Sequence, residues 1–126
     1  MAEKMNPEVK ALWVADLRSG KHNQAKRVLN CEDGFCCLGR LTDLFIASPA
    51  NLLNNQWGVL LEGDTDNRKN FGSSSTVLSE NVMRWAGLKH TTGNSVEIDG
   101  EKRSLTELND AGYCFLQIAD IIEAQL

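Results

Sequence analysis

The sequence predicts a single α+β domain covering residues 1–126, with about four helices packed on a small antiparallel sheet. Three observations lead to this prediction. Several segments have apolar residues at helical spacing between capping residues, one Asp-Gly pair separates two short strand-like segments, and no internal repeat or low-complexity tract interrupts the chain. A chain of 126 residues with 42% hydrophobic residues is also long enough to bury one core.

The first helix is predicted to begin after Asn6, which caps it, with Pro7 at the first helical position. Gly20 ends it. Its apolar stripe is Val9, Leu12, Trp13 and Leu17.

A second helix is predicted to begin near Phe35, with Asp33 as its cap, and to stop at Ser48-Pro49. Its apolar stripe is Phe35, Leu38, Leu41, Leu44 and Phe45. Before it, residues 27–29 are either a short strand or an extended connector.

Residues 50–76 are rich in asparagine and glycine, which is typical of turns. Between the turns, residues 56–61 are predicted to form a strand, residues 64–69 a loop and residues 73–75 a surface loop. A short third helix then begins at Ser79, its cap, and ends at Gly87.

The last third of the chain contains a hairpin and two helices. Residues 96–105 form the hairpin, which turns at Asp99-Gly100. Ser104 opens a short helix through a capping box, and Gly112 ends that helix. The apolar face of the final helix is Phe115, Ile118, Ala119, Ile122 and Leu126.

Several sequence blocks together resemble a family of small proteins encoded by tailed bacteriophages and prophages. The most specific blocks are Phe35-Cys36-Cys37-Leu38-Gly39 and Leu108-Asn109-Asp110-Ala111-Gly112, and the first helix adds a third. This chain departs from the family pattern at Arg40, usually apolar, and at Cys114, usually serine. The resemblance implies a viral origin and therefore the cytoplasm of a bacterial host. It implies no particular activity.

Charge is unevenly distributed along the chain, whose net charge is −4. Residues 18–27 contain four basic residues and no acid. An acidic chain repels the phosphate backbone from which nucleic-acid binding draws most of its affinity, so we expect no direct nucleic-acid partner. No apolar run approaches the roughly 20 residues of a membrane span, and no secretory leader opens the chain, so neither membrane insertion nor secretion is expected.

The four cysteines, Cys31, Cys36, Cys37 and Cys114, do not have the spacing of a metal site. Adjacent helical residues point about 100° apart, so Cys36 and Cys37 would not face one ion. No metal, and no cofactor with a nucleotide-binding or hydrolase motif, is expected. Buried thiols are favoured. The alternative is a nucleophilic thiol whose pKa is lowered in the first turn of a helix, with His22 or His90 as base.

These features favour a phage-encoded, non-enzymatic binding protein that inhibits a host antiviral defence component, such as a CRISPR effector, by direct protein binding. The chain is small and acidic, and acidic surfaces can compete for the basic grooves of nucleic-acid enzymes. One alternative is sequestration of a small anionic ligand such as a nucleotide signal. A second alternative is a cysteine-dependent enzyme. The oligomeric state is not predicted.

Two surface patches are predicted to bind the partner or ligand. The charged one is Arg18, Lys21, Lys26 and Arg27, a run without obvious acidic partners nearby in the sequence. The polar-aromatic one is Asn55, Gln56 and Trp57, in the turn-rich segment, because loops on a rigid scaffold often carry recognition. For Asn109 and Asp110 a structural role is favoured, in which their side chains bond to nearby backbone.

Overall fold

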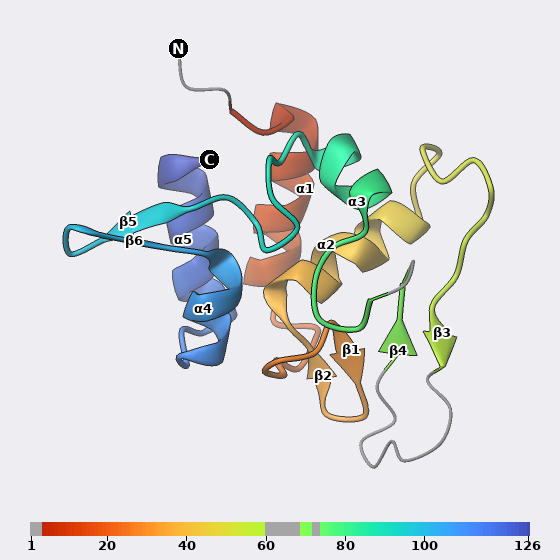
Figure 1. The fold of residues 1–126 in the computed structure, drawn as a ribbon, viewed down its shortest axis with the longest axis horizontal. Coiled ribbons are helices and arrows are strands. Elements are labelled where there is room, and N and C mark those ends of the chain that lie inside the picture. Colours follow the sequence, from red (N-terminus) through yellow and green to blue (C-terminus); the bar gives the residue numbers. More distant parts are fainter. Residues whose placement is uncertain (1–3, 60–68, 72–73) are drawn as a thin grey trace.

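The computed structural model describes residues 4–59, 69–71 and 74–126, and it confirms the α+β class. Helix α1 lies in the middle of the molecule, with α5 on one side and α2 on the other (Figure 1). The shorter α3 and α4 complete the helical layer. The five helices within the described residues are α1 (Pro7–Arg18), α2 (Cys37–Ile46), α3 (Glu80–Ala86), α4 (Leu105–Asp110) and α5 (Phe115–Gln125).

The strands form two separate antiparallel sheets instead of the single sheet expected. The larger has the order β2-β1-β4-β3, and the smaller is the β5-β6 hairpin. Both lie at the edge of the helical layer (Figure 1), so the helices pack mainly on one another. The strands are β1 (Asn30–Cys31), β2 (Gly34–Phe35), β3 (Gly58–Val59), β4 (Lys69–Asn70), β5 (Val96–Ile98) and β6 (Glu101–Arg103).

Trp13 lies at the centre of the core and joins α1 to α2. Its side chain is fully buried, and its Nε1 donates a hydrogen bond to the carbonyl oxygen of Cys37 at 2.9 Å. The stripe predicted for α1 is wrong at one position: Leu12 is 53% exposed, and Val14 is buried instead. At about 100° per residue, Leu12 falls outside the arc of the helix that the buried residues Val9, Trp13, Val14 and Leu17 cover.

The predicted helix caps of α1, α3 and α4 are confirmed. The Asn6 side chain accepts hydrogen bonds from the second and third helical amides of α1, and Ser79 caps α3. Ser104 and Glu107 form the capping box that begins α4. Gly87 ends α3 at a φ of 74°, a left-handed conformation that glycine adopts without steric cost.

The predicted start of α2 is wrong by two residues. Phe35 belongs to β2, because its N–H donates to the carbonyl of Asn23 and its own carbonyl accepts from the Ala25 N–H. Asp33 lies in the β1–β2 turn, and Cys36 caps α2 with its Sγ accepting from the Gly39 N–H at 3.4 Å.

Gly39 is required by a close approach between α2 and the segment before β1. A Cβ atom at this position would collide with the carbonyl group of Leu29. Any side chain there would push α2 away from the core. Residues 27–29, for which the sequence left two alternatives, form a connector that leads into β1.

The hairpin prediction is confirmed, because Asp99 and Gly100 both have positive φ angles between β5 and β6. The strand predicted at 56–61 is confirmed only at β3, because residues 56–57 are not in a strand and residues 60–61 lie outside the described residues. Lys69 is predicted to lie in a loop, but it belongs to β4 and pairs with Val59 of β3. Residues 64–68 lie outside the described part. Of the predicted surface loop, Ser74 and Ser75 are described and half-buried.

Candidate functional site

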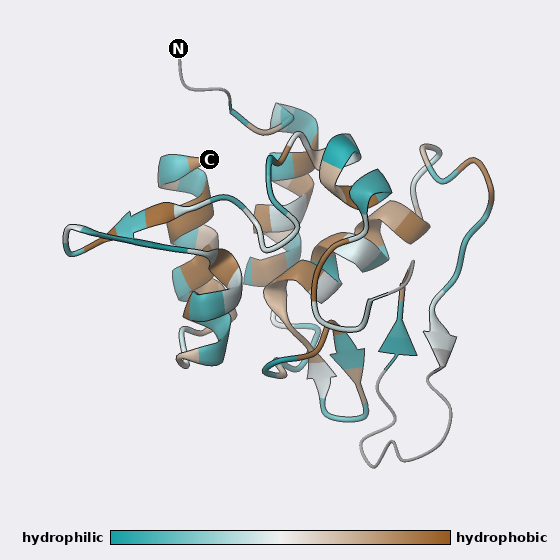
Figure 2. Ribbon diagram, viewed as in Figure 1, coloured by the Kyte–Doolittle hydropathy of each residue, from teal (hydrophilic) through white to brown (hydrophobic). Residues whose placement is uncertain are grey.

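The most exposed large apolar side chains of the described residues stand next to each other on the α2–β3 loop, residues 47–57. Leu52 is 89% exposed and Leu53 is 79% exposed. In Figure 2 this loop carries a hydrophobic stretch well away from the helical core. A single exposed leucine is ordinary, but two adjacent ones at these exposures indicate a contact surface.

The loop that carries the two leucines is held in place by hydrogen bonds. The side chain of Asn51 donates to the carbonyl oxygens of Ile46 at 3.2 Å and Asn55 at 2.9 Å, and its Oδ1 accepts from the Asn55 N–H at 2.9 Å. A further backbone bond joins the Asn54 N–H to the Asn51 carbonyl. The leucines are therefore presented by a closed turn anchored to the end of α2.

A hollow of about 440 Å³ lies between this loop and α3. Its apolar lining includes Phe45 and Trp85 together with the two leucines. Polar residues from both elements also line it: Asn51, Asn55, Asn81 and Arg84. Protein–protein interfaces combine apolar and polar side chains in this way. We call these eight residues, with Ala50, the leucine-loop surface.

The predicted polar-aromatic patch borders the leucine-loop surface. Asn55 lines the hollow, and Gln56 is exposed beside it. Trp57 is half-buried: its Nε1 donates to Asp43 Oδ1 at 3.1 Å, and its ring packs against two phenylalanine rings. Trp57 thus anchors the loop to the core. Sequence analysis missed Leu52 and Leu53, whose only signal was two leucines in a turn-rich run without helical or strand periodicity.

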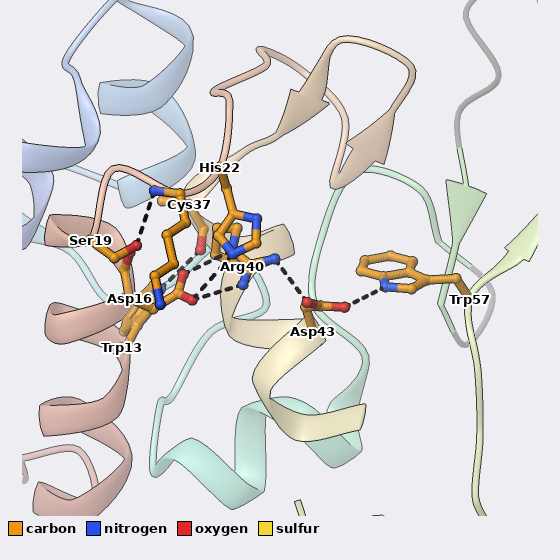
Figure 3. Close-up of polar contacts among 9 residues, drawn as sticks. Trp13, Asp16, Ser19, His22, Cys37, Arg40, Asp43 and Trp57 are labelled. Atoms are coloured by element: carbon orange, nitrogen blue, oxygen red, sulfur yellow. Dashed lines mark hydrogen bonds and ion pairs between the residues drawn. The ribbon is translucent and has the colours of Figure 1, made fainter. Parts of the chain in front are cut away.

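Arg40 is the centre of a buried ionic network. Its side chain is 3% exposed, its Nε and Nη2 donate to Asp16 at 2.8 and 2.7 Å, and its Nη1 donates to Asp43 at 2.8 Å (Figure 3). The guanidinium carbon lies 4.6 Å from the ring centre of Phe35. Burial lowers the pKa of Arg40, but the hydrogen bonds to the two aspartates outweigh burial and raise it overall. Because Asp43 also binds Trp57, the network links α1, α2 and the end of the loop.

The two adjacent thiols lie inside the protein. Burial raises the pKa of Cys36 to about 11 and raises that of Cys37 well above its ordinary value. The buried thiols favoured from the sequence are confirmed for this pair. The alternative, a thiol pKa lowered in the first turn of α2, is wrong, because loss of hydration outweighs the backbone N–H groups there. His22, one of the two suggested bases, lies against Asp16 and the ring of Phe35.

These environments predict the order in which the cysteines react. In the folded protein at neutral pH, iodoacetamide should modify exposed Cys114 first and half-buried Cys31 more slowly. Cys36 and Cys37 should react only after unfolding. Mass spectrometry of peptides from timed samples measures each rate, with a sample in urea as control. Modification of Cys36 or Cys37 in the folded protein as fast as free cysteine would contradict the prediction.

The predicted charged patch is divided in the structure. Arg18 has acidic partners after all: its guanidinium binds Asp120 at 2.7 Å and Glu123 at 2.8 Å, both on α5. The hydrogen bonds to Glu123 and Asp120 raise the pKa of Arg18. These acids are about a hundred residues away in the chain, so no local pattern could reveal them. Lys21 is exposed at the end of α1.

Lys26 and Arg27 line a second hollow of about 440 Å³, which does not include Arg18. Its other polar lining residues are Gln24, Cys31 and Asp33. Here the chain runs from the end of α1 toward β1. Of the four predicted basic residues, the structure therefore places Lys26 and Arg27 together. We call this site the basic depression.

In the described part of the chain, no helix is both long and apolar enough to cross a bilayer. The longest one, α1, has 12 residues, whereas a span needs about 20. Across the same residues, no three histidine, cysteine, aspartate or glutamate side chains gather where they could hold a metal ion.

Comparison with known proteins gives a family for nearly the whole chain. A family model described as a domain of unknown function, DUF8296, matches residues 5–126. No curated protein matches the chain, and no solved structure matches it. The family match includes both the leucine-loop surface and the basic depression.

Proposed function

We propose that this chain, which belongs to the DUF8296 family, is a small phage-encoded protein that inhibits a host antiviral defence component by binding it directly. The single observation that carries the proposal is the pair Leu52 and Leu53, exposed on a loop fixed by hydrogen bonds. The viral origin rests on the resemblance of the Phe-Cys-Cys-Leu-Gly and Leu-Asn-Asp-x-Gly blocks to phage proteins. A nucleic-acid enzyme such as a CRISPR effector is the kind of target we propose.

The leucine-loop surface supplies apolar area that a partner can bury. Transferring a leucine side chain from water into an apolar pocket contributes about 1.5–3 kcal/mol. Leu52 and Leu53 would both be transferred almost completely, because both are nearly fully exposed. The Asn51 hydrogen bonds hold the loop in shape before contact, which lowers the entropy lost on binding.

The charge of the chain favours a basic partner. There are 17 acidic against 13 basic residues, and on α5 the two negative charges of Asp120 and Glu123 exceed the one positive charge of Arg18 that they bind. Enzymes that bind DNA or RNA present basic grooves, and opposite charge accelerates association. We therefore propose that charge guides the encounter and that the leucine pair fixes the complex.

A plating assay tests this function. Bacteria that carry one of a panel of defence systems are infected with a phage that the system restricts, with and without this protein. We expect the wild-type chain to restore plaque formation against at least one system, and the Leu52→Asp/Leu53→Asp variant to lose that effect. The matched control is Leu12→Asp/Leu116→Asp, which places the same charges on the two other exposed leucines of the described residues. That control should restore plaques like the wild type.

Two results would contradict the proposal. One is that the wild-type chain relieves none of the defence systems in the panel. The other is that the Leu52→Asp/Leu53→Asp variant, folded with an unchanged melting temperature, restores plaques as well as the wild type. The leucines are exposed, so their replacement should leave the fold intact.

A further inference from the structure

The basic depression has the features of a small-ligand site. Lys26 and Arg27 line it, together with Asp33 from the β1–β2 turn. We infer that it binds a small phosphate ester that carries hydroxyl groups, of the nucleotide class. The inference does not depend on the leucine-loop surface.

Within the described part of the protein, neither the Lys26 ammonium nor the Arg27 guanidinium forms an ion pair with a carboxylate, although Asp33 lines the same depression and Asp110 accepts from the Arg27 backbone N–H. The other described arginines each bind at least one carboxylate; these are Arg18, Arg40, Arg84 and Arg103. Arg27 is exposed, and its described bond is made by its backbone N–H. In an acidic chain, two neighbouring cations without carboxylate partners are available to an anionic ligand.

Arg27 also has a strained backbone. Its φ is 68°, in the left-handed region that a residue with a Cβ atom rarely adopts. The carboxylate of Asp110 holds this conformation by accepting the Arg27 N–H at 2.8 Å. Glycine or asparagine would adopt it at lower cost, and strain of this kind is concentrated at binding sites. The strained backbone conformation therefore determines where the Arg27 side chain lies relative to the depression.

The backbone on both sides of the pair is anchored. The Ala25 N–H donates to the Phe35 carbonyl at 2.7 Å, and the Ala25 carbonyl accepts from Asn109 Nδ2 at 2.8 Å. After the pair, the Leu29 N–H donates to the Ser75 carbonyl at 2.7 Å. The two cations are therefore attached to a fixed backbone, which reduces the entropy that binding would cost.

The side chains of the depression determine the class of ligand. A guanidinium can donate two parallel hydrogen bonds to phosphate oxygens, and an ammonium adds a point charge. Asp33 can accept hydrogen bonds from hydroxyl groups and would repel a second phosphate. The volume, about 440 Å³, lies within the range of small-molecule sites. A sugar bearing one phosphate fits the depression in three respects: its phosphate suits the two cations, its hydroxyl groups suit Asp33, and its size suits the volume.

Isothermal titration calorimetry at low salt tests the inference with four probes: adenosine 5′-monophosphate, ribose 5-phosphate, adenosine and inorganic phosphate. We expect heat from the two phosphate esters, weaker binding as salt increases, and none from adenosine. The Arg27→Gly variant should lose at least tenfold in affinity for adenosine 5′-monophosphate. Its melting temperature should stay the same or increase, because glycine relieves the strain. Lys102→Gln, an exposed lysine on β6, is the matched control and should bind normally.

The Asp33→Asn variant tests the hydroxyl contact separately. It should weaken binding of adenosine 5′-monophosphate while leaving or improving that of inorganic phosphate, because a negative charge is removed. The inference is overturned if none of the phosphate compounds produces heat at millimolar concentration. It is equally overturned if Arg27→Gly binds adenosine 5′-monophosphate like the wild type, or if adenosine binds as tightly as its phosphate.

Discussion

Replacing Arg40 with leucine is expected to lower the free energy of unfolding by about 3–5 kcal/mol, as loss of one partner of a buried ion pair does. Arg40 is 3% exposed, and its removal leaves the Asp16 carboxylate, whose side chain is 12% exposed, without its cation. Asp43 would also lose the charge that orients it toward Trp57. Urea denaturation followed by tryptophan fluorescence measures the change.

A second substitution separates the ion pair from simple loss of packing. The Arg40→Leu/Asp16→Leu variant should recover part of the lost stability, because no buried carboxylate remains without a partner beside the new apolar side chain. Glu80→Ala, which removes the exposed partner of Arg84, is the control and should change stability by less than about 0.5 kcal/mol. A loss below about 1 kcal/mol for Arg40→Leu alone would show that the network contributes little to the fold.

Asn109→Leu is expected to lower the free energy of unfolding by at least about 3 kcal/mol, since each buried polar group left without a partner costs about 1–3 kcal/mol. Asn109 is fully buried. Its Oδ1 accepts from Gln24 at 2.8 Å and from the Cys37 N–H at 3.2 Å, and its Nδ2 donates to the Ala25 carbonyl. One side chain thus joins α4, the segment before β1 and the start of α2.

Thermal or urea unfolding checks this loss, with Asn55→Ala as an exposed asparagine control that should change stability little. The buried bonds of Asn109 confirm the structural role favoured from the sequence. Its bonds reach residues far away in the chain, whereas the sequence suggested nearby backbone. An Asn109→Leu variant as stable as the wild type would show that water satisfies the groups that Asn109 now binds.

Elements whose ends depend on local chemistry could be predicted from the sequence. Asn6, Ser79 and Ser104 each bond to amides two or three residues ahead, and Asp99-Gly100 sets its own turn. The start of α2 could not be predicted in this way. Phe35 has helical spacing with the residues that follow it, but its backbone bonds to Asn23 and Ala25 keep it extended.

The candidate sites were less predictable because exposure and pairing are tertiary properties. The sequence contains no pattern that separates Leu52 and Leu53 from core leucines, and it places Arg18 far from its two acids on α5. Arg40 could be noted only as a charged residue at a position that is usually apolar in the family the chain resembles. The sequence shows that Lys26 and Arg27 are two neighbouring basic residues. It does not show the depression that they line, because the depression forms only when the β1–β2 turn brings Asp33 to the same site.

Photo-crosslinking from the α2–β3 loop tests the central claim most directly. A photoreactive phenylalanine analogue is placed at position 53 in one variant and at position 12, on an exposed part of α1, in a control variant. Each variant is irradiated in bacteria whose defence system the wild-type chain relieves. We predict a crosslink from position 53 to a component of that defence system and none from position 12. A crosslink to that component from position 12 with none from position 53 would contradict binding through the leucine-loop surface.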